Sequence, residues 1–252
     1  MMNSKYRIVI IESPYANWGE LGVPDFFSKI VSLRKAGFGG VYPPEVLPVD
    51  TADFIGNHFI ICEETPENLE PVLIYKSISS QRCRAHNLTF PLIGLAQAAK
   101  ADFPFRVLSE LLVEYQNRGH DPFYNGGWTI KPEIRKDREK VGILKSIMMG
   151  VEVLFHQELS HDFSKTVVFS GGAIRFKVPE YLASYGFKPI TFEGNPLDPI
   201  HVVHLGGEPA SFLYLTEFSP EAKQAAESIK YLWSNRIHFR HSLEENKIQR
   251  AA

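Results

Sequence analysis

The N-terminal half of the chain switches between strand-like and helix-like hydrophobic patterns. Residues 6–12 are a β-branched run bounded by a Ser-Pro dipeptide, which is typical of a strand followed by a loop. Apolar residues then recur every three or four positions over 24–37, which predicts an amphipathic helix. Two β-rich runs, 58–62 and 71–80, flank a polar turn and predict an antiparallel hairpin.

The second half continues this mixture of strands and helices. In chain order, the patterns predict helices at 92–100 and through 107–115, a strand at 128–130, a charged turn, a helix at 141–158, a strand at 166–170, a helix at 179–184, strands at 201–205 and 211–216, and a helix from Ser219 to about Trp233. Helices that follow strands indicate the α/β class. With no repeat or low-complexity linker, we expect one domain over 1–252, with 200–252 as a C-terminal strand and helix extension.

Composition and charge narrow the range of functions. With 44% apolar and 22% charged residues, the chain is neither disordered, collagenous nor a coiled coil. The net charge of −2, from 27 basic and 29 acidic residues, gives no overall signature of nucleic-acid or membrane-surface binding. The longest apolar runs fall short of the roughly 20 residues that span a bilayer. We therefore expect a soluble, cytoplasmic protein; the sequence leaves its oligomeric state open.

Cysteine and histidine spacings give no metal site. Cys62 and Cys83 lack C-x-x-C spacing, and we expect both to be buried free thiols. His156 and His161 are five residues apart, whereas two ligands on one helix face need a spacing of four. We predict no bound metal and no covalently attached cofactor.

A basic turn before the long central helix is a candidate anion site. Four cationic side chains surround the predicted start of this helix, and Gly142 would allow a close approach of the backbone; they are Arg135, Lys136, Arg138 and Lys140. A helix N-terminus offers unpaired N–H groups and a positive dipole end, which together favour phosphate. The alternative is a solvated, charge-balanced helix start, because Glu133, Asp137 and Glu139 offset much of this charge.

Two segments resemble the GNAT superfamily of N-acyltransferases. Residues 130–135, IKPEIR, followed by Gly142 and a long helix, are similar to its acyl-CoA-binding motif, V-x-P-E-x-R before a glycine-rich turn. Residues 181–189, YLASYGFKP, resemble its later Y-x-x-x-GFK segment. The resemblance implies a mixed, mostly antiparallel twisted sheet flanked by helices, and acyl-CoA or an acyl carrier protein as co-substrate. The donor-binding positions it implies are Ile130, Arg135, Arg138, Lys140, Val141, Gly142 and Ile143.

A fainter likeness points to one branch, the acyl-homoserine-lactone synthases and the related long-chain N-acyl amino acid synthases. It rests on Leu33-Arg34-x-x-x-Phe38, Asp50-x-x-Asp53 before a strand, and Arg84 with Pro91-Leu92 ahead of a helix. The acceptor-binding positions it implies are Arg34, Asp50, Asp53, Arg84 and Trp128. Carboxylates could hold a cationic amine and arginines a carboxylate, although surface ion pairs without a ligand explain these residues equally well.

Acyl transfer to an amine needs a polarised thioester carbonyl, a route for the amine proton and an acid for the leaving thiolate. Tyr181 and Tyr185 are the candidate acids by the resemblance, with core packing as the alternative. His120 is a candidate base because a histidine titrates near neutrality.

The sequence therefore predicts an N-acyltransferase that moves an acyl group from a thioester to a small-molecule amine by direct attack. A catalytically silent ligand-binding or regulatory protein of the same fold is the alternative, and a chance occurrence of the two motifs in another α/β fold is the third.

Overall fold

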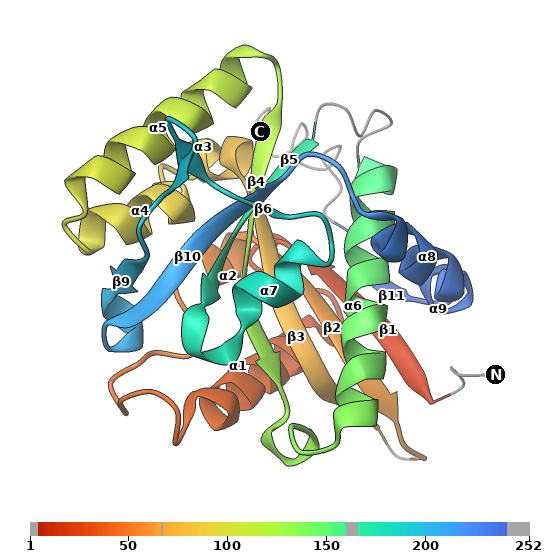
Figure 1. Cartoon of the computed structure of the whole chain (residues 1–252). Helices are drawn as coiled ribbons and strands as arrows, with labels where there is room; N and C mark the ends of the chain where they lie inside the picture. The colour runs from red at the N-terminus through yellow and green to blue at the C-terminus, as the bar shows by residue number, and fades with distance from the viewer. Residues whose placement is uncertain (1–4, 67, 160–165, 241–252) are drawn as a thin grey trace, which may run out of the picture.

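One twisted sheet forms the centre of the molecule in the computed structural model, which describes residues 5–66, 68–159 and 166–240 (Figure 1). Its strands are β1 (Tyr6–Glu12), β2 (Asn57–Glu64), β3 (Leu69–Ser79), β4 (Asp121–Ile130), β5 (Thr166–Ala173), β6 (Lys188–Pro189), β9 (Ile200–Val202), β10 (Glu208–Leu215) and β11 (Ile237–Phe239). The strand order is β11-β1-β2-β3-β4-β5-β10-β6, and β9 also pairs with β10. A separate ribbon joins β7 (Thr191–Phe192) to β8 (Asn195–Pro196).

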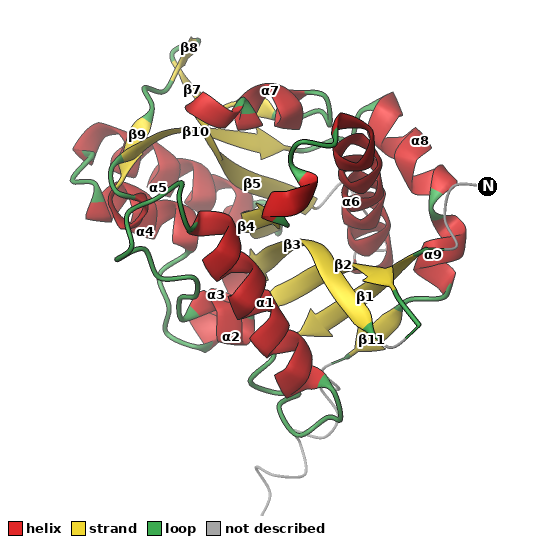
Figure 2. Cartoon of the chain, turned by 90° about the horizontal axis from the view of Figure 1, so that it is seen from below, coloured by secondary structure: helices red, strands yellow, loops and turns green. Residues whose placement is uncertain are grey.

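Helices cover both faces of this sheet, as the view from below shows (Figure 2). One face carries α1 (Val23–Phe38), α2 (Ala52–Ile55), α3 (Ser80–Ala85), α4 (Pro91–Ala98) and α5 (Asp102–Asn117). The other carries α6 (Arg138–Leu159), α7 (Val178–Ala183), α8 (Pro220–Ser228) and α9 (Lys230–Ser234). Single 3-10 turns are η1 (Pro132–Ile134), η3 (Ile174–Phe176) and η4 (Val203–Leu205).

The predicted fold class is confirmed. Within the described residues, the strand pairs are antiparallel except for β4 with β5 and β1 with β11. Because both faces are covered, the central strands bury successive side chains on alternate sides. Tyr75 packs toward α6 whereas Ile74 packs toward α1, so these strands are apolar throughout rather than alternating with polar residues.

Several sequence predictions are correct and others need revision. The strand at 6–12 and the hairpin of β2 and β3 are confirmed. The predicted strand at 128–130 is only the end of β4, because Gly126 and Gly127 interrupt the strand signal in its middle. The predicted C-terminal helix is broken at Ile229 into α8 and α9, and the chain continues after Ser234 into the short strand β11.

The segment after residue 200 is built into the sheet at two separate places. β10 lies between β5 and β6, and β11 pairs in parallel with β1 at the far edge. The predicted strand at 201–205 is shorter, since β9 ends at Val202 and continues as the turn η4. None of the helices that the structure describes is long and apolar enough to cross a bilayer.

Candidate functional site

The parallel strands β4 and β5 separate halfway along their length. They pair from Asp121 with Thr166 as far as Asn125 with Ser170, and the pairing then stops although both strands continue. The Ser170 hydroxyl donates a hydrogen bond to the Asn125 carbonyl at 3.0 Å, at the point where the strands part. The edge of β4 that faces β5 beyond this point has no strand partner among the described residues, so its backbone groups can receive an extended ligand.

A β-bulge reshapes β4 within this opening. Ile74 pairs with Thr129 and Lys76 with Gly126, so β4 has one more residue than β3 over this stretch. Gly127 has φ of 66°, a left-handed conformation that favours glycine. A bulge redirects the backbone N–H groups next to it, so this part of β4 can present an N–H to a ligand in the opening.

Strands β4 and β5 each carry a Gly-Gly pair directly after the last residue that pairs with the other strand. On β4 the sequence is Asn125-Gly126-Gly127, and on β5 it is Ser170-Gly171-Gly172. A Cβ atom at Gly171 would lie 3.0 Å from the Phe212 ring. A Cβ at Gly126, Gly127 or Gly172 would likewise lie within 3.0 Å of Tyr124, Arg34 or Pro179. The protein's own packing therefore requires glycine at all four positions, and both strands carry backbone without side chains there.

A buried carboxyl on α6 faces the point of separation. Glu152 is 2% exposed, and its Oε1 accepts a hydrogen bond of 2.7 Å from Asn125 Nδ2. Burial raises the pKa of Glu152 to about 8, although the Asn125 hydrogen bond acts in the opposite direction. A carboxyl that titrates near neutral pH can act as an acid or as a base.

Aromatic side chains form the wall beside Glu152. The Tyr75 ring lies 5.5 Å from that of Trp128, which lies 6.3 Å from that of Tyr181. Four buried polar atoms here have no hydrogen-bond partner in the described part of the chain: Tyr75 Oη, Asn125 Oδ1, Trp128 Nε1 and Glu152 Oε2. Because buried polar groups are normally paired, this cluster suits a polar ligand or ordered water.

The two predicted acid tyrosines both lie on this side of the sheet. The hydroxyls of Tyr181 and Tyr185 each donate to the Lys145 carbonyl, at 3.1 and 3.0 Å. Burial, and then the nearby Glu152, raise the pKa of Tyr181 far above its usual range. Tyr185 is 1% exposed and part of the core. Tyr181 is the better placed of the two, because its ring touches Trp128 at the opening.

A second buried polar cluster lies on the opposite face of the same strands. Asp53 pairs with the guanidinium of Arg34, and its Oδ2 lies 3.1 Å from Lys76 Nζ. Lys76 also contacts Asp50 Oδ1 at 2.6 Å, and the His58 ring nitrogen Nε2 lies 2.6 Å from the Asp53 carbonyl oxygen. Of the predicted acceptor-side residues, Arg34, Asp50 and Asp53 are thus brought together.

The charges of this cluster balance one another. Burial alone would raise the pKa of Asp53, but Arg34 and then Lys76 outweigh it and hold that pKa well below its ordinary value. Burial lowers the pKa of His58 to about 4, so this histidine is neutral at pH 7. Arg34 also lies against the bulge, since a Cβ at Gly127 would be 2.7 Å from its Nη2 atom. The cluster therefore supports β4 from behind the opening.

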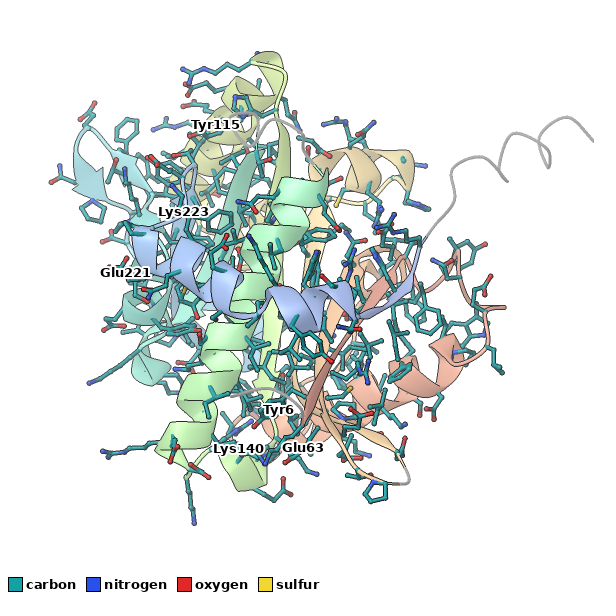
Figure 3. All side chains as sticks on the ribbon, turned by 90° about the vertical axis from the view of Figure 1, so that its right-hand side faces the viewer. Tyr6, Glu63, Tyr115, Lys140, Glu221 and Lys223 are labelled. Atoms are coloured by element: carbon teal, nitrogen blue, oxygen red, sulfur yellow. The ribbon has the colours of Figure 1, made fainter. Side chains whose placement is uncertain are left out.

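The predicted anion turn precedes α6 as expected, but several of its polar groups already form hydrogen bonds or ion pairs within the protein. Asp137 Oδ1 accepts the Lys140 backbone N–H at 3.0 Å, which places a carboxylate at the start of the helix. Lys140 Nζ lies 2.7 Å from Glu63 Oε2. Figure 3 shows these two side chains beside each other. Arg135 donates to the carbonyls of Ile130 and Gly37, at 3.1 and 2.8 Å. Arg135, Lys136 and Arg138 are all exposed, but only Lys136 and Arg138 have no ion pair or side-chain hydrogen bond within the described residues.

The other predicted donor positions lie at the start of α6. Gly142 is exposed, and a Cβ there would meet nothing within 4 Å. The protein itself therefore has no need of glycine at this position. Val141 and Ile143 are half-buried and pack against the core. Ile130 ends β4, where it pairs with Leu73.

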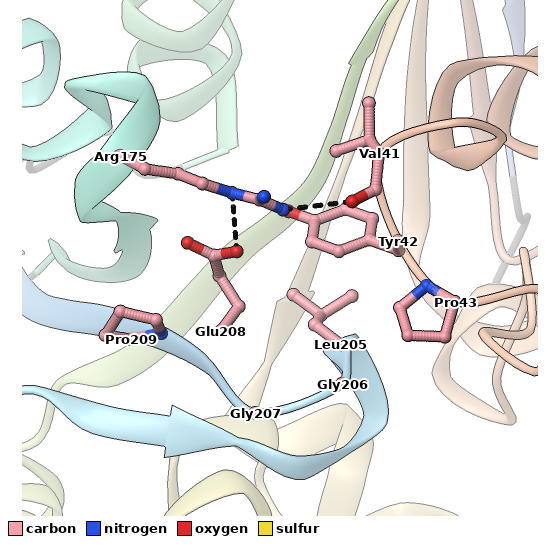
Figure 4. A pocket seen from close by; sticks show the side chains of 9 residues that line it. All are labelled: Val41, Tyr42, Pro43, Arg175, Leu205, Gly206, Gly207, Glu208 and Pro209. Carbon is pink, nitrogen blue, oxygen red and sulfur yellow. Dashed lines mark hydrogen bonds and ion pairs between the residues drawn. The ribbon is translucent and has the colours of Figure 1, made fainter.

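A hollow of about 350 Å³ opens next to the end of β5 (Figure 4). Arg175, two residues after β5, lies 2.6 Å from Glu208 Oε2 and donates to the Val41 carbonyl at 3.1 Å. Its guanidinium also lies 5.3 Å from the centre of the Tyr42 ring. This arginine ties the loop after α1 to the start of β10.

Two predicted site residues lie away from the opening. His120 immediately precedes β4, five residues before Asn125, which is roughly 16 Å along a strand. Arg84 is exposed on α3, where it donates to Ser80 Oγ at 3.4 Å. The described residues hold no group of three or more possible metal ligands, and His161 lies outside them. Cys62 and Cys83 are buried and free, as predicted.

Sequence reasoning missed Glu152, Asn125, Tyr75 and the two glycine pairs. A signal for Glu152 was present, since it is the single charged residue in the apolar run 147–155. A second signal was the repetition of a polar residue followed by Gly-Gly in two predicted strand regions.

No protein-family model matches the chain, and no curated protein matches it. Among solved structures, it is similar to FeeM, an N-acyl amino acid synthase from uncultured soil microbes, with 11% identity over 90% of this chain and 98% of that one and a TM-score of 0.46. A polyamine N-acetyltransferase of Drosophila melanogaster has 11% identity over 82% and 99%, with a TM-score of 0.42. AtaTR bound with AcCoA has 14% identity over 92% and 99%, with a TM-score of 0.41. Similarity at this level decides nothing about activity, which has to follow from this chain's own geometry.

Proposed function

We propose that this protein is an N-acyltransferase that binds an acyl thioester between the diverging ends of β4 and β5. The observation that carries the proposal is the separation of the strands after Asn125 and Ser170, with a Gly-Gly pair on each wall. A donor whose arm is rich in amides can add to the free edge of β4 in the manner of an extra strand. The bulge at Gly127 would supply a backbone N–H to polarise the thioester carbonyl.

The start of α6 is the proposed site for the donor's phosphates. Lys136 and Arg138 are exposed there, and Gly142 leaves the surface of the first turns open. Asp137 already satisfies one helical N–H, so the exposed cations rather than the helix end carry most of the attraction. Coenzyme A and the phosphopantetheine arm of an acyl carrier protein both provide such phosphates.

Direct attack by the amine, without a covalent enzyme intermediate, fits the state of the chain's cysteines and of Ser170, none of which is activated as a nucleophile. Burial raises the pKa of Cys62 to about 12 and that of Cys83 to about 11, so neither forms a thiolate at neutral pH. Ser170 donates its hydroxyl to a backbone carbonyl instead of to a base. The amine acceptor would enter from the side of the hollow near Arg175, with Asp50 as the exposed carboxylate on that face.

The first experiment combines thermal melting with turnover. Purified protein is heated with coenzyme A, acetyl-CoA, a long-chain acyl-CoA and holo acyl carrier protein, and a ligand at 100 times its Kd stabilises by about 2.7 kcal/mol. Free-thiol release is then followed with the matching acyl donors and a panel of primary amines. We expect one donor class to raise the Tm and to release thiol only when an amine is present.

A charge-reversal pair tests the donor site. Arg138→Glu should weaken donor binding about tenfold, or ~1.4 kcal/mol, without changing the Tm of the free protein. Arg106→Glu is the matched control, because Arg106 is also exposed and lies on α5 at the opposite face of the sheet. Equal donor Kd values in both variants would refute the phosphate site.

The second candidate function is a catalytically silent binding protein of the same fold. The observation that favours it is the engagement of both tyrosine hydroxyls by the Lys145 carbonyl, which leaves the acid implied by the family resemblance unavailable. This alternative predicts a donor-induced rise in Tm with no thiol release for any amine.

A further inference from the structure

The leaving thiolate of the proposed reaction needs a proton source on the α6 side of the opening. The phosphate site at the start of α6 means that the donor arm enters from this face, and the acceptor from the opposite one. The sulfur of a thioester held at the bulge would then lie toward α6. An alkyl thiolate is a poor leaving group unless it is protonated as the C–S bond breaks.

Tyr181 and Tyr185 are badly suited to this task. Each hydroxyl already donates its proton to the Lys145 carbonyl, and one of these rings is part of the core. Glu152 has the opposite geometry. One oxygen is held by Asn125, the last paired residue of β4, and the other has no partner among the residues that the structure describes.

We propose that Glu152 is the catalytic acid that protonates the leaving thiolate, an inference that rests on the proposed acyl transfer. Its fixed oxygen sets the carboxyl at the base of the opening, and its second oxygen carries the proton toward the sulfur. Glu152 is 2% exposed and lies close to Tyr75 and Tyr181, so bulk water has little access to its carboxyl.

The step balances in atoms and charge. The amine nitrogen forms a bond to the thioester carbon, the C–S bond breaks, and the Glu152 proton passes to sulfur to give the free thiol. The surplus proton on the new amide nitrogen leaves to water, and the Glu152 carboxylate then regains a proton from water. The products are the amide, the thiol and the enzyme in its starting protonation state.

The surroundings of Glu152 allow its titration to be observed. The titratable groups that face it are Tyr75 on β3, Tyr181 on α7 and, one turn along α6, His156. Burial raises the pKa of both tyrosines and lowers that of His156 to about 3, so all three are neutral near pH 8. Lys145 lies two turns away on α6, and burial lowers its pKa from 10.5.

The test is the pH dependence of kcat/KM for the wild-type protein and Glu152→Gln. We expect the wild-type rate to fall as the pH rises through about 8, because the acid loses its proton there. Glu152→Gln should lose about a hundredfold in kcat and also lose this alkaline limb. Glu114→Gln, an exposed carboxylate on α5, is the matched control and should behave as the wild type.

A second acyl donor distinguishes a catalytic role of Glu152 as an acid from a structural role alone. An aryl thioester of the same acyl group releases a much more acidic thiol, which departs without protonation. Glu152→Gln should therefore recover most of its rate with this donor. A variant that is equally slow with both donors would overturn the assignment of Glu152 as the acid.

Asn125→Leu provides an independent readout if Glu152→Gln folds poorly. The Asn125 hydrogen bond lowers the pKa of Glu152, so its loss should move the alkaline limb to higher pH. Two results would overturn the Glu152 proposal and leave the acyltransferase function standing. One is an Asn125→Leu variant that turns over like the wild type with its alkaline limb at the wild-type pH; the other is an unaffected rate in Glu152→Gln. No turnover of any thioester by the wild-type protein would instead refute the proposed function.

Discussion

Two buried carboxyls, Glu152 and Asp53, lie on opposite faces of the sheet, and their pKa values are shifted in opposite directions. Glu152 is 2% exposed and Asp53 is 1% exposed, so desolvation acts on both. Glu152 has a single neutral donor, Asn125, and its pKa rises to about 8. Asp53 has two cationic neighbours, Arg34 and Lys76, and its pKa falls below its ordinary value.

The difference shows that burial alone does not fix the charge of a carboxyl. Partners of opposite charge compensate the desolvation of Asp53, which makes its cluster a support for β4. Without such partners, Glu152 keeps a proton that it can donate near neutral pH. The structural cluster and the proposed catalytic group thus use the same residue chemistry on two faces of the same strands.

The largest expected effect comes from Asp53→Asn. This change leaves the buried cations Arg34 and Lys76 without their carboxylate, so we expect a loss of about 3–5 kcal/mol in the free energy of unfolding at pH 7. Urea unfolding provides the measurement, and Asp25→Asn, which removes an exposed pair with Lys29, should stay within about 0.5 kcal/mol of wild type. In the wild type, the contribution of Asp53 is lost only as the pH falls below its ordinary pKa of 3.8.

Glu152→Gln should raise the free energy of unfolding relative to the wild type, whereas Asp53→Asn lowers it. Between pH 4.5 and about 8, the unfolded wild-type chain releases this proton whereas the folded protein retains it. Wild-type stability should therefore fall by up to about 1.4 kcal/mol per pH unit relative to the variant over this window, and remain level above it. Urea unfolding at pH 5, 6.5 and 8 measures the slope. Parallel curves for the two proteins would mean that Glu152 is ionised in the folded state at neutral pH.

Gly127→Ala tests whether the two clusters are coupled through β4. The new Cβ would occupy a left-handed backbone position 2.7 Å from the Arg34 guanidinium, so we expect a loss of about 1–3 kcal/mol. If the bulge also polarises the thioester, kcat should fall by more than the loss of folded protein explains. Chemical unfolding combined with single-turnover acyl transfer distinguishes the two effects.

Gly142→Ala has the smallest expected effect and the opposite sign. Its Cβ meets nothing within 4 Å, and alanine favours a helix over glycine by about 0.5–1 kcal/mol. The Tm of the free protein should rise slightly. A weaker response of the Tm to the donor would then place the donor against this turn, whereas an unchanged response would place it elsewhere.

Sequence patterns were sufficient to predict the helices and strands whose hydrophobic pattern lies within one continuous run of residues. The strand at 6–12, the β2–β3 hairpin and the long helix before Leu159 all follow from runs of adjacent residues. Strand β4 is harder to recognise, because the two glycines of its bulge, Gly126 and Gly127, also remove its strand signal. The same two residues thus weaken the strand prediction and form the β-bulge of the candidate site.

The candidate site was only partly accessible from the sequence. Arg34, Asp50 and Asp53 were predicted as a group and do lie together, with Lys76 added from a strand more than twenty residues away. His120, predicted from its residue type, and Arg84, implied by the family resemblance, both lie away from the opening. The roles of all these residues in binding or catalysis stay predictions for the experiments above.

The sequence by itself determined the α/β class and the basic turn before a long helix, since each depends on neighbouring residues. Only the tertiary structure decided that β4 and β5 run side by side and then part, and that Glu152 meets Asn125 across 27 positions of the chain. It also decided which buried carboxyl has cationic partners and which has none. Such pairings depend on contacts between distant segments, and desolvation and Coulomb interaction act through those contacts rather than along the chain.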